Sequence, residues 1–377
     1  MIRPVHGGNL AWAAALAGCP ASAILDFSAS ISPLGPPESA LDAIQAHLSS
    51  LTAYPDPDYG ELRAALGEAL NVDPDWILPG NGSAELLTWA AWDLSKLEAT
   101  YLVTPAFGDY SRALSAFGAK VLKCPLDLQL LDAAPVRRLV TDDLSVSNRS
   151  LVSPSFRLPV PLALDAERGL LLNNPHNPTG LLFGREAILP YVKQFGMVVV
   201  DEAFMDFLPP WEQETLIDAV EEFPNLVILR SLTKFYSLPG LRLGCAIAHP
   251  DILGRWQLLR DPWPVNALAA AAAAAVVRDT VFERQTWDWL PVARFELFEG
   301  LANLPGLQPI AGAANFLLVE SSMSVSLIQK SLLERHRILI RDCLSFPELG
   351  DRFFRVAVRA RADNLRLIAG LTDVISR

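Results

Sequence analysis

Short apolar runs and helical patterns alternate through the middle of the chain. The runs typical of strands cover residues 76–79, 101–103, 169–172, 197–200, 226–229 and 241–248, and helical patterns occur at 84–94, 109–117 and 185–194. Such alternation predicts an α/β domain built on a mostly parallel sheet. Polar residues recur just after these runs, which is where open α/β sheets bind ligands. We therefore expect the functional site along that edge of the sheet.

The two ends of the chain follow other patterns. Helices are expected at 10–17, 38–48 and 61–70, with turns rich in proline and glycine between them. Beyond residue 255 we expect a long helix at 280–301, a strand at 315–319, a helix at 324–335, β runs at 338–341 and 353–358, and a closing helix. This order predicts a second domain of mixed α+β type.

These patterns divide the chain into three parts. We interpret residues 1–48 as an N-terminal arm and part of a small domain, residues 49–258 as a large domain, and residues 259–377 as the small α+β domain. The arm is expected to pack with the small domain. Residues 121–165 show weak periodicity, and we assign no chemistry to them.

Composition narrows the class of protein. Hydrophobic residues make up 51% of the 377 positions and charged residues 19%, which is typical of a globular protein with a large core. The net charge of −11 argues against non-specific binding to nucleic acid or anionic membranes. The longest apolar stretch, residues 267–277, falls well short of the roughly 20 residues that cross a bilayer. The four scattered cysteines match no metal or disulfide pattern and the start of the chain lacks a signal-peptide core, so we expect a cytoplasmic protein without a metal.

Lys234 lies in the stretch with the most marked chemistry, residues 231–244. Flanking buried strands would remove its amine from water, which lowers the pKa and makes the amine a better nucleophile toward a carbonyl. Ser231, Thr233 and Arg242 add two hydroxyls and a cation, a group that suits a phosphate. One amine for an aldehyde and several donors for a phosphate describe pyridoxal 5′-phosphate. The alternative is an ordinary surface lysine in a turn, because most lysines are exposed.

Two polar residues at other turns bear on this hypothesis. Asn177 stands between two prolines that fix the backbone, so its amide would be held in place to donate to a phenolate-like oxygen. Asp201 ends an apolar run, and a partly desolvated carboxylate there would favour a cationic partner such as a protonated pyridine nitrogen. The alternatives are a turn asparagine and an aspartate that caps a following helix.

A helix start and an aromatic residue add to the set. Gly82, Ser83 and Ala84 open a helix directly after a strand, and the free N–H groups of a first helical turn bind phosphate. A plain N-cap role for Ser83 accounts equally well for this stretch. Phe107 has the planar face needed to stack on a ring, although a single aromatic residue is more often part of the core.

The motifs N-P-H-N-P-T-G, D-E-A-F and S-L-T-K followed by G-L-R-L-G occur in this order, and the match covers nearly the whole chain. Together they resemble the fold-type I pyridoxal-phosphate enzymes of the aminotransferase superfamily, class I/II. That resemblance implies a large domain with a mostly parallel seven-stranded sheet between helices, and a smaller α+β domain. The sequence is most similar to the L-threonine-O-3-phosphate decarboxylases of cobalamin biosynthesis, through matches at 6–9, 25–28, 229–236, 262–268, 337–341 and 354–359. Histidinol-phosphate aminotransferases, which share the cofactor residues, come next.

The resemblance implies a role for each matching cofactor residue. Lys234 would form the Schiff base, Asp201 would pair with the pyridinium, Asn177 would donate to the ring oxygen, and Phe107 would stack on the ring. The cofactor phosphate would be held by Gly82, Ser83, Ala84, Ser231, Thr233 and Arg242. Tyr54 would reach the cofactor of a neighbouring subunit, which implies a homodimer with shared active sites.

The resemblance also implies the substrate residues. Arg355 would clamp a carboxylate, while His6 and Arg341 would hold a phosphate, since the planar guanidinium binds either group through two parallel hydrogen bonds. Asn177 and Ser30 would line the same site. These decarboxylases often have asparagine where this chain has Ser30 and Ser32, so the shorter hydroxyls would hold the substrate less tightly.

The expected activity is decarboxylation of L-threonine O-3-phosphate to aminopropanol phosphate. A lyase and an aminotransferase can share every cofactor residue and differ only in how the two anionic ends of the substrate are positioned. The alternatives are therefore amino transfer from an amino acid or histidinol phosphate and, in another class, a non-catalytic pyridoxal-phosphate-binding protein. We expect a phosphorylated amino acid as the partner, and neither nucleic acid nor membrane.

Overall fold

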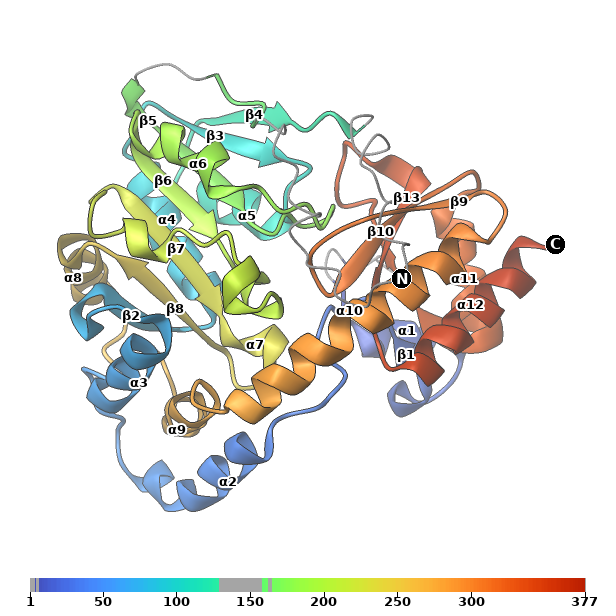
Figure 1. Ribbon diagram of the computed structural model, residues 1–377, viewed down its shortest axis with the longest axis horizontal. Helices are drawn as coiled ribbons and strands as arrows, with labels where there is room; N and C mark the ends of the chain where they lie inside the picture. Colours follow the sequence, from blue (N-terminus) through green and yellow to red (C-terminus); the bar gives the residue numbers. More distant parts are fainter. Residues whose placement is uncertain (1–3, 5–6, 129–157, 162–164, 377) are drawn as a thin grey trace.

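A computed structural model describes residue 4 and residues 7–128, 158–161 and 165–376. His6 and most of the 121–165 segment, about which the sequence was least informative, lie outside the described residues. In Figure 1 a seven-stranded sheet lies on the left and a four-stranded sheet on the right. The long helix α10 (Thr280–Ala302) runs from one to the other. No helix of the described residues is long and apolar enough to cross a membrane.

The larger sheet is mostly parallel. Its strands are β2 (Ile77–Asn81), β3 (Ala99–Thr104), β4 (Val121–Pro125), β5 (Asp165–Asn173), β6 (Phe195–Asp201), β7 (Leu226–Ser231) and β8 (Leu243–Ala248), in the order β2-β8-β7-β6-β5-β3-β4. From β4 to β7 every neighbouring pair is parallel, whereas β8 runs antiparallel to both β7 and β2. The prediction of an α/β fold with a mostly parallel seven-stranded sheet is confirmed.

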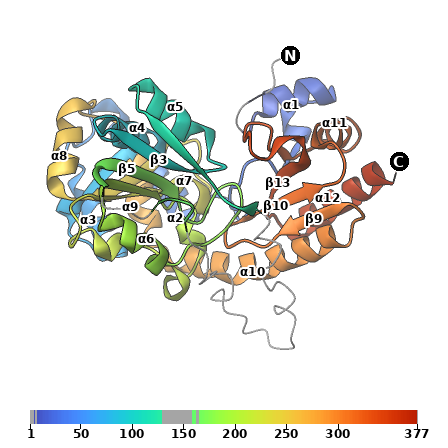
Figure 2. The same ribbon diagram turned by 90° about the horizontal axis from the view of Figure 1, so that it is seen from above.

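Helices cover both faces of this sheet (Figure 2). One face carries α4 (Ser83–Leu94), α5 (Gly108–Ala116) and α8 (Pro250–Leu259), and the other carries α3 (Gly60–Leu70), α6 (Arg185–Val192) and α9 (Ala267–Val276). The strands are apolar throughout because alternate residues enter two cores. Leu171 and Val199 face the α4 side, whereas Leu170 and Val198 face the α6 side.

The alanine-rich stretch forms one of these helices. The side chain of Asn266 accepts a hydrogen bond from the N–H of Ala269 at 2.9 Å, which satisfies one of the free donors at the start of α9. Small side chains then allow α2 (Glu38–Ala46) to pack against α9. The stretch is a packed helix rather than a membrane segment, as its length predicted.

The smaller sheet is antiparallel. Its strands are β12 (Arg341–Asp342), β13 (Phe353–Ala357), β10 (Phe316–Ser321) and β9 (Leu307–Ile310), in that order. The helices α11 (Val325–His336) and α12 (Arg361–Ile375) pack with each other, and α12 also packs against α10. This arrangement brings Arg341 and Arg355 onto neighbouring strands.

The N-terminal arm joins the same half of the molecule. Strand β1 (Leu25–Asp26) pairs in parallel with β11 (Ile338–Leu339), and α1 (Leu10–Ala17) packs against α11. The β run expected at 338–341 is therefore not one strand. Residues 338–339 pair with the arm and residues 341–342 pair with β13, because the chain changes sheets at the buried Ile340.

Candidate active site

The polar residues expected after strand ends do gather along one edge of the larger sheet. Asn173, Asp201 and Ser231 are the last residues of β5, β6 and β7, and Asn173 lies directly opposite Asp201 in the parallel pairing. Lys234 follows on the single helical turn α7 (Leu232–Phe235), which begins directly after Ser231. Neighbouring parallel strands thus carry the carboxylate and the amine to the same edge.

Lys234 has a partly buried amine with a lowered pKa. Its Nζ donates to Ser231 Oγ at 3.2 Å and lies 5.1 Å from the centre of the Phe204 ring. Burial is the main cause of the lowered pKa, and nearby arginines add to it, while the charge of Asp201 acts in the opposite direction. A lysine whose neutral form is favoured in this way suits attack on an aldehyde.

Asp201 is a buried carboxylate held by two hydrogen bonds. Tyr110 donates to its Oδ2 at 2.8 Å, and the backbone N–H of Ala203 donates to its Oδ1 at 3.0 Å. Burial raises the pKa of Asp201, whereas the charge of Lys234 and the two hydrogen bonds act to lower it. The group thus has a reason to pair with a further cation, as expected for a partner of a protonated ring nitrogen.

The first turn of α4 could hold an anion. Gly82 precedes the helix with a φ of 76°, and a Cβ there would lie 2.6 Å from Nη2 of Arg242. Only glycine combines this conformation with so close an approach. Ser83 and Ala84 begin the twelve-residue helix, so their N–H groups stand at its positive end.

The hydroxyls of the lysine turn lie beside the same helix start. Ser231 is opposite Gly244 on paired strands, and a Cβ on Gly244 would lie 2.6 Å from the backbone nitrogen of Ser83. The hydroxyls of Ser231 and Thr233 are 2.8 Å apart and bonded to each other. The structure therefore brings together the residues that the sequence predicted for a phosphate.

Arg355 reaches across from the smaller sheet to the loop after β5. Its Nη1 donates to Oδ1 of Asn177, and its guanidinium lies 4.6 Å from the centre of the Phe316 ring. Burial lowers the pKa of Arg355 to about 10, so the side chain stays charged at neutral pH. Because Oδ1 of Asn177 accepts from Arg355, its amide nitrogen is the atom that can donate to a ligand.

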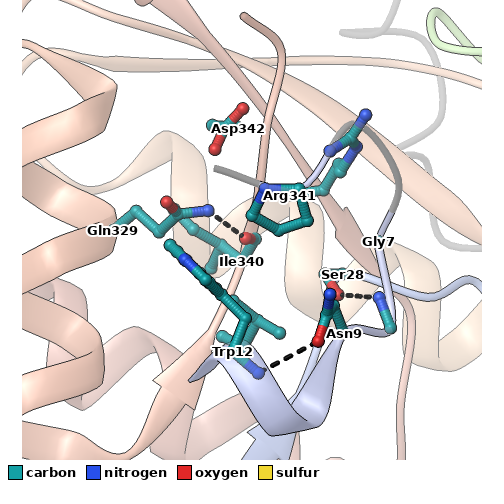
Figure 3. Close-up of a pocket in the computed structure, with 11 residues that line it drawn as sticks. Gly7, Asn9, Trp12, Ser28, Gln329, Ile340, Arg341 and Asp342 are labelled. Atoms are coloured by element: carbon teal, nitrogen blue, oxygen red, sulfur yellow. Dashed lines mark hydrogen bonds between the residues drawn. The ribbon is translucent and has the colours of Figure 1, made fainter. Parts of the chain in front are cut away.

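Arg341 lies directly opposite Arg355 on β12 and β13. Its Nη2 donates to Ser345 Oγ at 2.6 Å. Figure 3 shows Arg341 in a small pocket that is walled on one side by the N-terminal arm, with Gly7 and Ser28 close by. A Cβ on Gly7 would lie 2.3 Å from the carbonyl oxygen of Ser28, so the arm depends on glycine to approach this closely. The predicted partner of Arg341, His6, is outside the described residues.

Three other residues that the sequence predicted for the site differ in how deeply they are buried. Phe107 is partly buried, with its ring edge-to-face with Tyr110 at a centroid distance of 5.7 Å. Ser30, which belongs to the N-terminal arm, is buried. Tyr54 is 77% exposed and stacks on Trp263 at 4.3 Å, so it makes no described contact with the residues of the strand edge. Its role toward the cofactor of a neighbouring subunit stays a prediction.

Several buried polar atoms at this site lack a hydrogen-bond partner among the described residues. They are Ser30 Oγ, Thr104 Oγ1, Asn173 Oδ1 and Arg355 Nε. Thr104 and Asn173 end neighbouring strands of the larger sheet, whereas Ser30 and Arg355 come from the arm and the smaller sheet. Leaving a buried polar atom unsatisfied costs roughly 1–3 kcal/mol, so a bound group that satisfies these atoms would stabilise the protein. An amine, a buried carboxylate, an amide donor and a helix start with hydroxyls fit a group that has an aldehyde, a basic ring nitrogen, a ring oxygen and a phosphate.

Sequence reasoning missed some residues that contact the predicted ones. Tyr110 bonds to Asp201, Phe204 lies under the amine of Lys234, and Ser345 holds Arg341. Phe204 is the last letter of the D-E-A-F motif, and Tyr110 stands three residues after Phe107, one helical turn away. Ser345 has no comparable signal, because its contact depends on the turn after β12.

Comparisons with known proteins agree with this geometry. Residues 22–371 match the family described as aminotransferase class I and II. The chain is 37% identical over 385 residues to threonine-phosphate decarboxylase of Salmonella typhimurium, covering 100% of this chain and 98% of the relative. The histidinol-phosphate aminotransferase of Clostridium acetobutylicum has a similar structure, with a TM-score of 0.78, 25% identity, and 94% and 99% of the two chains covered. The L-threonine-O-3-phosphate decarboxylase of Porphyromonas gingivalis has a TM-score of 0.76 at 23% identity, with 93% and 99% covered. The chain belongs to the class I and II aminotransferase family.

Proposed function

We propose that this protein is a pyridoxal-phosphate-dependent lyase that decarboxylates L-threonine O-3-phosphate to (R)-1-amino-2-propanol phosphate and CO₂ in cobalamin biosynthesis. The observation that carries the proposal is the pair of buried arginines, Arg341 and Arg355, opposite each other on β12 and β13. A planar guanidinium suits a carboxylate or a phosphate, which it can bind through two parallel hydrogen bonds. A substrate with both groups would place one anionic end at each arginine.

The similar relatives support the same substrate. The relative from Salmonella typhimurium is named for threonine phosphate, and the match spans nearly the full length of both chains. Histidinol phosphate, named for another similar protein, carries a phosphate and an amine but no carboxylate. An aminotransferase would also bind the carboxylate of an amino-acid donor, so the two arginines fit either reaction. The lyase is favoured by the full-length match to the decarboxylase at 37% identity.

Pyridoxal 5′-phosphate is the cofactor that the residues fit. When bound, it supplies an electron sink for the bond that breaks at the substrate α-carbon. Lys234 would hold its aldehyde, Asp201 would keep the ring nitrogen protonated, and Asn177 would donate to the ring oxygen. Phe107 would cover the ring. The phosphate would rest on the start of α4 with Gly82, Ser83, Ala84, Ser231, Thr233 and Arg242.

Substrate positioning would decide which bond breaks. Arg355 would bind the carboxylate through its planar guanidinium, and Arg341, together with His6 from the arm, would bind the phosphate. Two fixed anionic ends leave the substrate little freedom to rotate, which is the main way that such a site selects one reaction. Ser30, whose buried hydroxyl has no described partner, would face the same substrate.

A direct assay tests the proposal. Purified protein loaded with pyridoxal phosphate is given L-threonine O-3-phosphate, and CO₂ and 2-oxo acids are both measured. Release of CO₂ without any 2-oxo acid is the expected result. Conversion of an amino acid to its 2-oxo acid, with the ketone that corresponds to histidinol phosphate as the amino acceptor, would instead identify an aminotransferase. Binding of the cofactor with neither reaction would favour a non-catalytic role.

We further propose that the protein is a homodimer. Leu41, Leu48 and Leu51 expose 51%, 44% and 61% of their surface, and Tyr54, beside Trp263, is the next exposed aromatic residue along the chain. Apolar side chains gathered on one short segment are typical of a covered surface. If a second subunit covers this segment, Tyr54 is placed to reach its cofactor. The division at 48/49 and 258/259 and the cytoplasmic location stay predictions.

A further inference from the structure

Tyr110 joins two residues that are expected to contact the cofactor ring from different sides. Its hydroxyl donates to Asp201 Oδ2 at 2.8 Å, and its ring meets the ring of Phe107 edge-to-face at 85°. Asp201 lies 91 positions further along the chain, at the end of β6, while Phe107 directly precedes α5. A single side chain in the first turn of α5 thus touches both.

Packing alone does not account for the hydroxyl of Tyr110. The ring is 2% exposed and belongs to the apolar core under α4 and α5, with Leu87 and Leu114 in the same cluster. Phenylalanine would fill that space without a polar atom to bury, and a buried hydroxyl is costly unless it has a partner. Here the partner is the carboxylate that faces the predicted ring nitrogen.

The surrounding charges show what the hydrogen bond does. Burial raises the pKa of Asp201, the charge of Asp109 on α5 raises it further, and Lys234 on α7 lowers it. Tyr110 and the N–H of Ala203 are the hydrogen-bond donors that favour the ionised carboxylate. Burial raises the pKa of Tyr110 well above its usual value, so this hydroxyl keeps its proton and remains a donor.

We propose that Tyr110 is a positioning residue that keeps the Asp201 carboxylate ionised and aimed at the ring nitrogen of the cofactor, while its ring supports Phe107. A carboxylate held in the ionised form leaves the shared proton on the ring nitrogen rather than on its own oxygen. The protonated ring is the form that withdraws electrons from the substrate. This inference rests on the cofactor site and is independent of which substrate is decarboxylated or transaminated.

The test compares Tyr110→Phe with Tyr191→Phe. Tyr191 is a matched control, since it is also a buried tyrosine, 6% exposed, whose hydroxyl donates to a backbone carbonyl, that of Val160, at 3.0 Å. Cofactor-free protein is titrated with pyridoxal phosphate, and the pH midpoint of the visible absorbance of the loaded protein is measured. Loss of a hydrogen bond to a charged group predicts cofactor affinity lower by about tenfold or more in Tyr110→Phe only. The pH midpoint is expected to rise, because an unprotonated ring leaves the lysine nitrogen more basic.

A double-mutant cycle separates positioning from general packing. In the Asp201→Ala background the Tyr110→Phe change should have little further effect on cofactor affinity, because its partner has gone. Should the Phe variant fail to fold, 3-fluorotyrosine placed at position 110 keeps the shape, makes the hydroxyl a stronger donor and should lower the pH midpoint. The proposal would be overturned if Tyr110→Phe had the same cofactor affinity and pH midpoint as Tyr191→Phe. It would also be overturned if Tyr110→Phe lowered cofactor affinity equally with and without Asp201, or if fluorination left the pH midpoint unchanged.

Discussion

The guanidinium of Arg355 on strand β13 donates to the Oδ1 of Asn177 in the loop after β5, joining residues that stand 178 positions apart. One is expected to bind the substrate carboxylate, and the other is expected to donate to the ring oxygen of the cofactor. The contact means that moving Arg355 also frees the amide of Asn177 to turn. The proposed substrate and cofactor roles would thus be linked through a single hydrogen bond.

Replacing Arg355 with lysine should therefore harm both substrate binding and catalysis. Lysine keeps the charge but cannot bind a carboxylate through two parallel hydrogen bonds, nor hold Asn177 at the same time. We expect KM for threonine phosphate to rise about tenfold or more and kcat to fall as well, a combined loss of roughly 2–4 kcal/mol in kcat/KM. Steady-state kinetics on Arg355→Lys measures this. Unchanged kcat with a raised KM would remove the proposed link to Asn177.

Arg341→Ala should act on the phosphate alone. Without this buried cation the phosphate dianion would lack its main partner, which predicts affinity for threonine phosphate weaker by about 2–5 kcal/mol. Unphosphorylated threonine, a poorer ligand, should bind equally to variant and parent. The control is Arg352→Ala, because Arg352 is exposed and pairs with Glu320 at 3.4 Å on the surface. Equal losses for both ligands would place Arg341 outside the phosphate site.

Gly82→Ala should weaken cofactor binding. An added Cβ would lie 2.6 Å from Arg242 Nη2 at a φ of 76°, which pushes that arginine away from the start of α4. We expect affinity for pyridoxal phosphate about tenfold lower, with substrate affinity of fully loaded protein little changed. Gly240→Ala is the control, since a Cβ at Gly240 meets nothing within 4 Å. Titration of cofactor-free protein gives the answer, and a normal affinity would contradict the phosphate role of this turn.

His176 should make stability depend on pH. Burial lowers the pKa of His176 from 6.5 to about 3, while its Nδ1 lies 2.8 Å from Thr179 Oγ1. Because the folded-state pKa is below the unfolded value, its contribution is fully present above about pH 6.5 and is lost as the pH falls toward 3. Between about pH 7 and about pH 5 this group alone should remove roughly 2 kcal/mol from the free energy of unfolding.

The variant His176→Gln isolates that contribution. Its free energy of unfolding should fall less than that of the parent over the same pH interval, whatever its stability at neutral pH. Urea unfolding of cofactor-free protein at both pH values measures the difference. Parallel losses in variant and parent would show that His176 stays neutral in the unfolded chain as well, or becomes protonated without unfolding.

Leu51→Asp should disrupt the proposed dimer. A charge on the segment between α2 and Tyr54 would be buried without a partner if a second subunit covers it, at a cost of several kcal/mol. Sedimentation at micromolar concentration should show monomers with reduced activity. Leu365→Asp on α12 is the control, because Leu365 is as exposed as Leu51, at 60% against 61%. A monomeric parent, or a dimer that survives the change, would contradict the proposed surface.

Local patterns predicted the elements that are apolar on both faces or that carry clear caps. The helix expected at 10–17 has those bounds in the structure, since Asn9 caps its start and Gly18, with a φ of 63°, ends it. Strand β4 was missed because it is an edge strand with partly exposed residues, including Lys123 and Pro125. Strand β9 was missed as well, since Pro309 interrupts its β pattern.

In the candidate site, too, features set by the local sequence could be predicted, whereas contacts between distant segments could not. Residues that sit inside a motif, such as Lys234 and Asp201, were predictable, because strand ends and turn residues place them. The contact of Arg341 with Ser345, and the hydrogen bond from Tyr110 to Asp201, depend on how separate segments pack. The break in the 338–341 run was invisible for the same reason, because the partner of each half decides its sheet.

Because β1 pairs with β11, this small sheet can form only late in translation. Residues 25–26 leave the exit tunnel early, but their partner strand at 338–339 is translated only when about nine-tenths of the chain has been made. During that interval the arm has no sheet to join, and closing so long a loop is slow. The pocket around Arg341 is thus completed last. A nascent polypeptide would therefore form the cofactor-binding part of the site well before the substrate-binding part, and a truncated polypeptide would lack the latter.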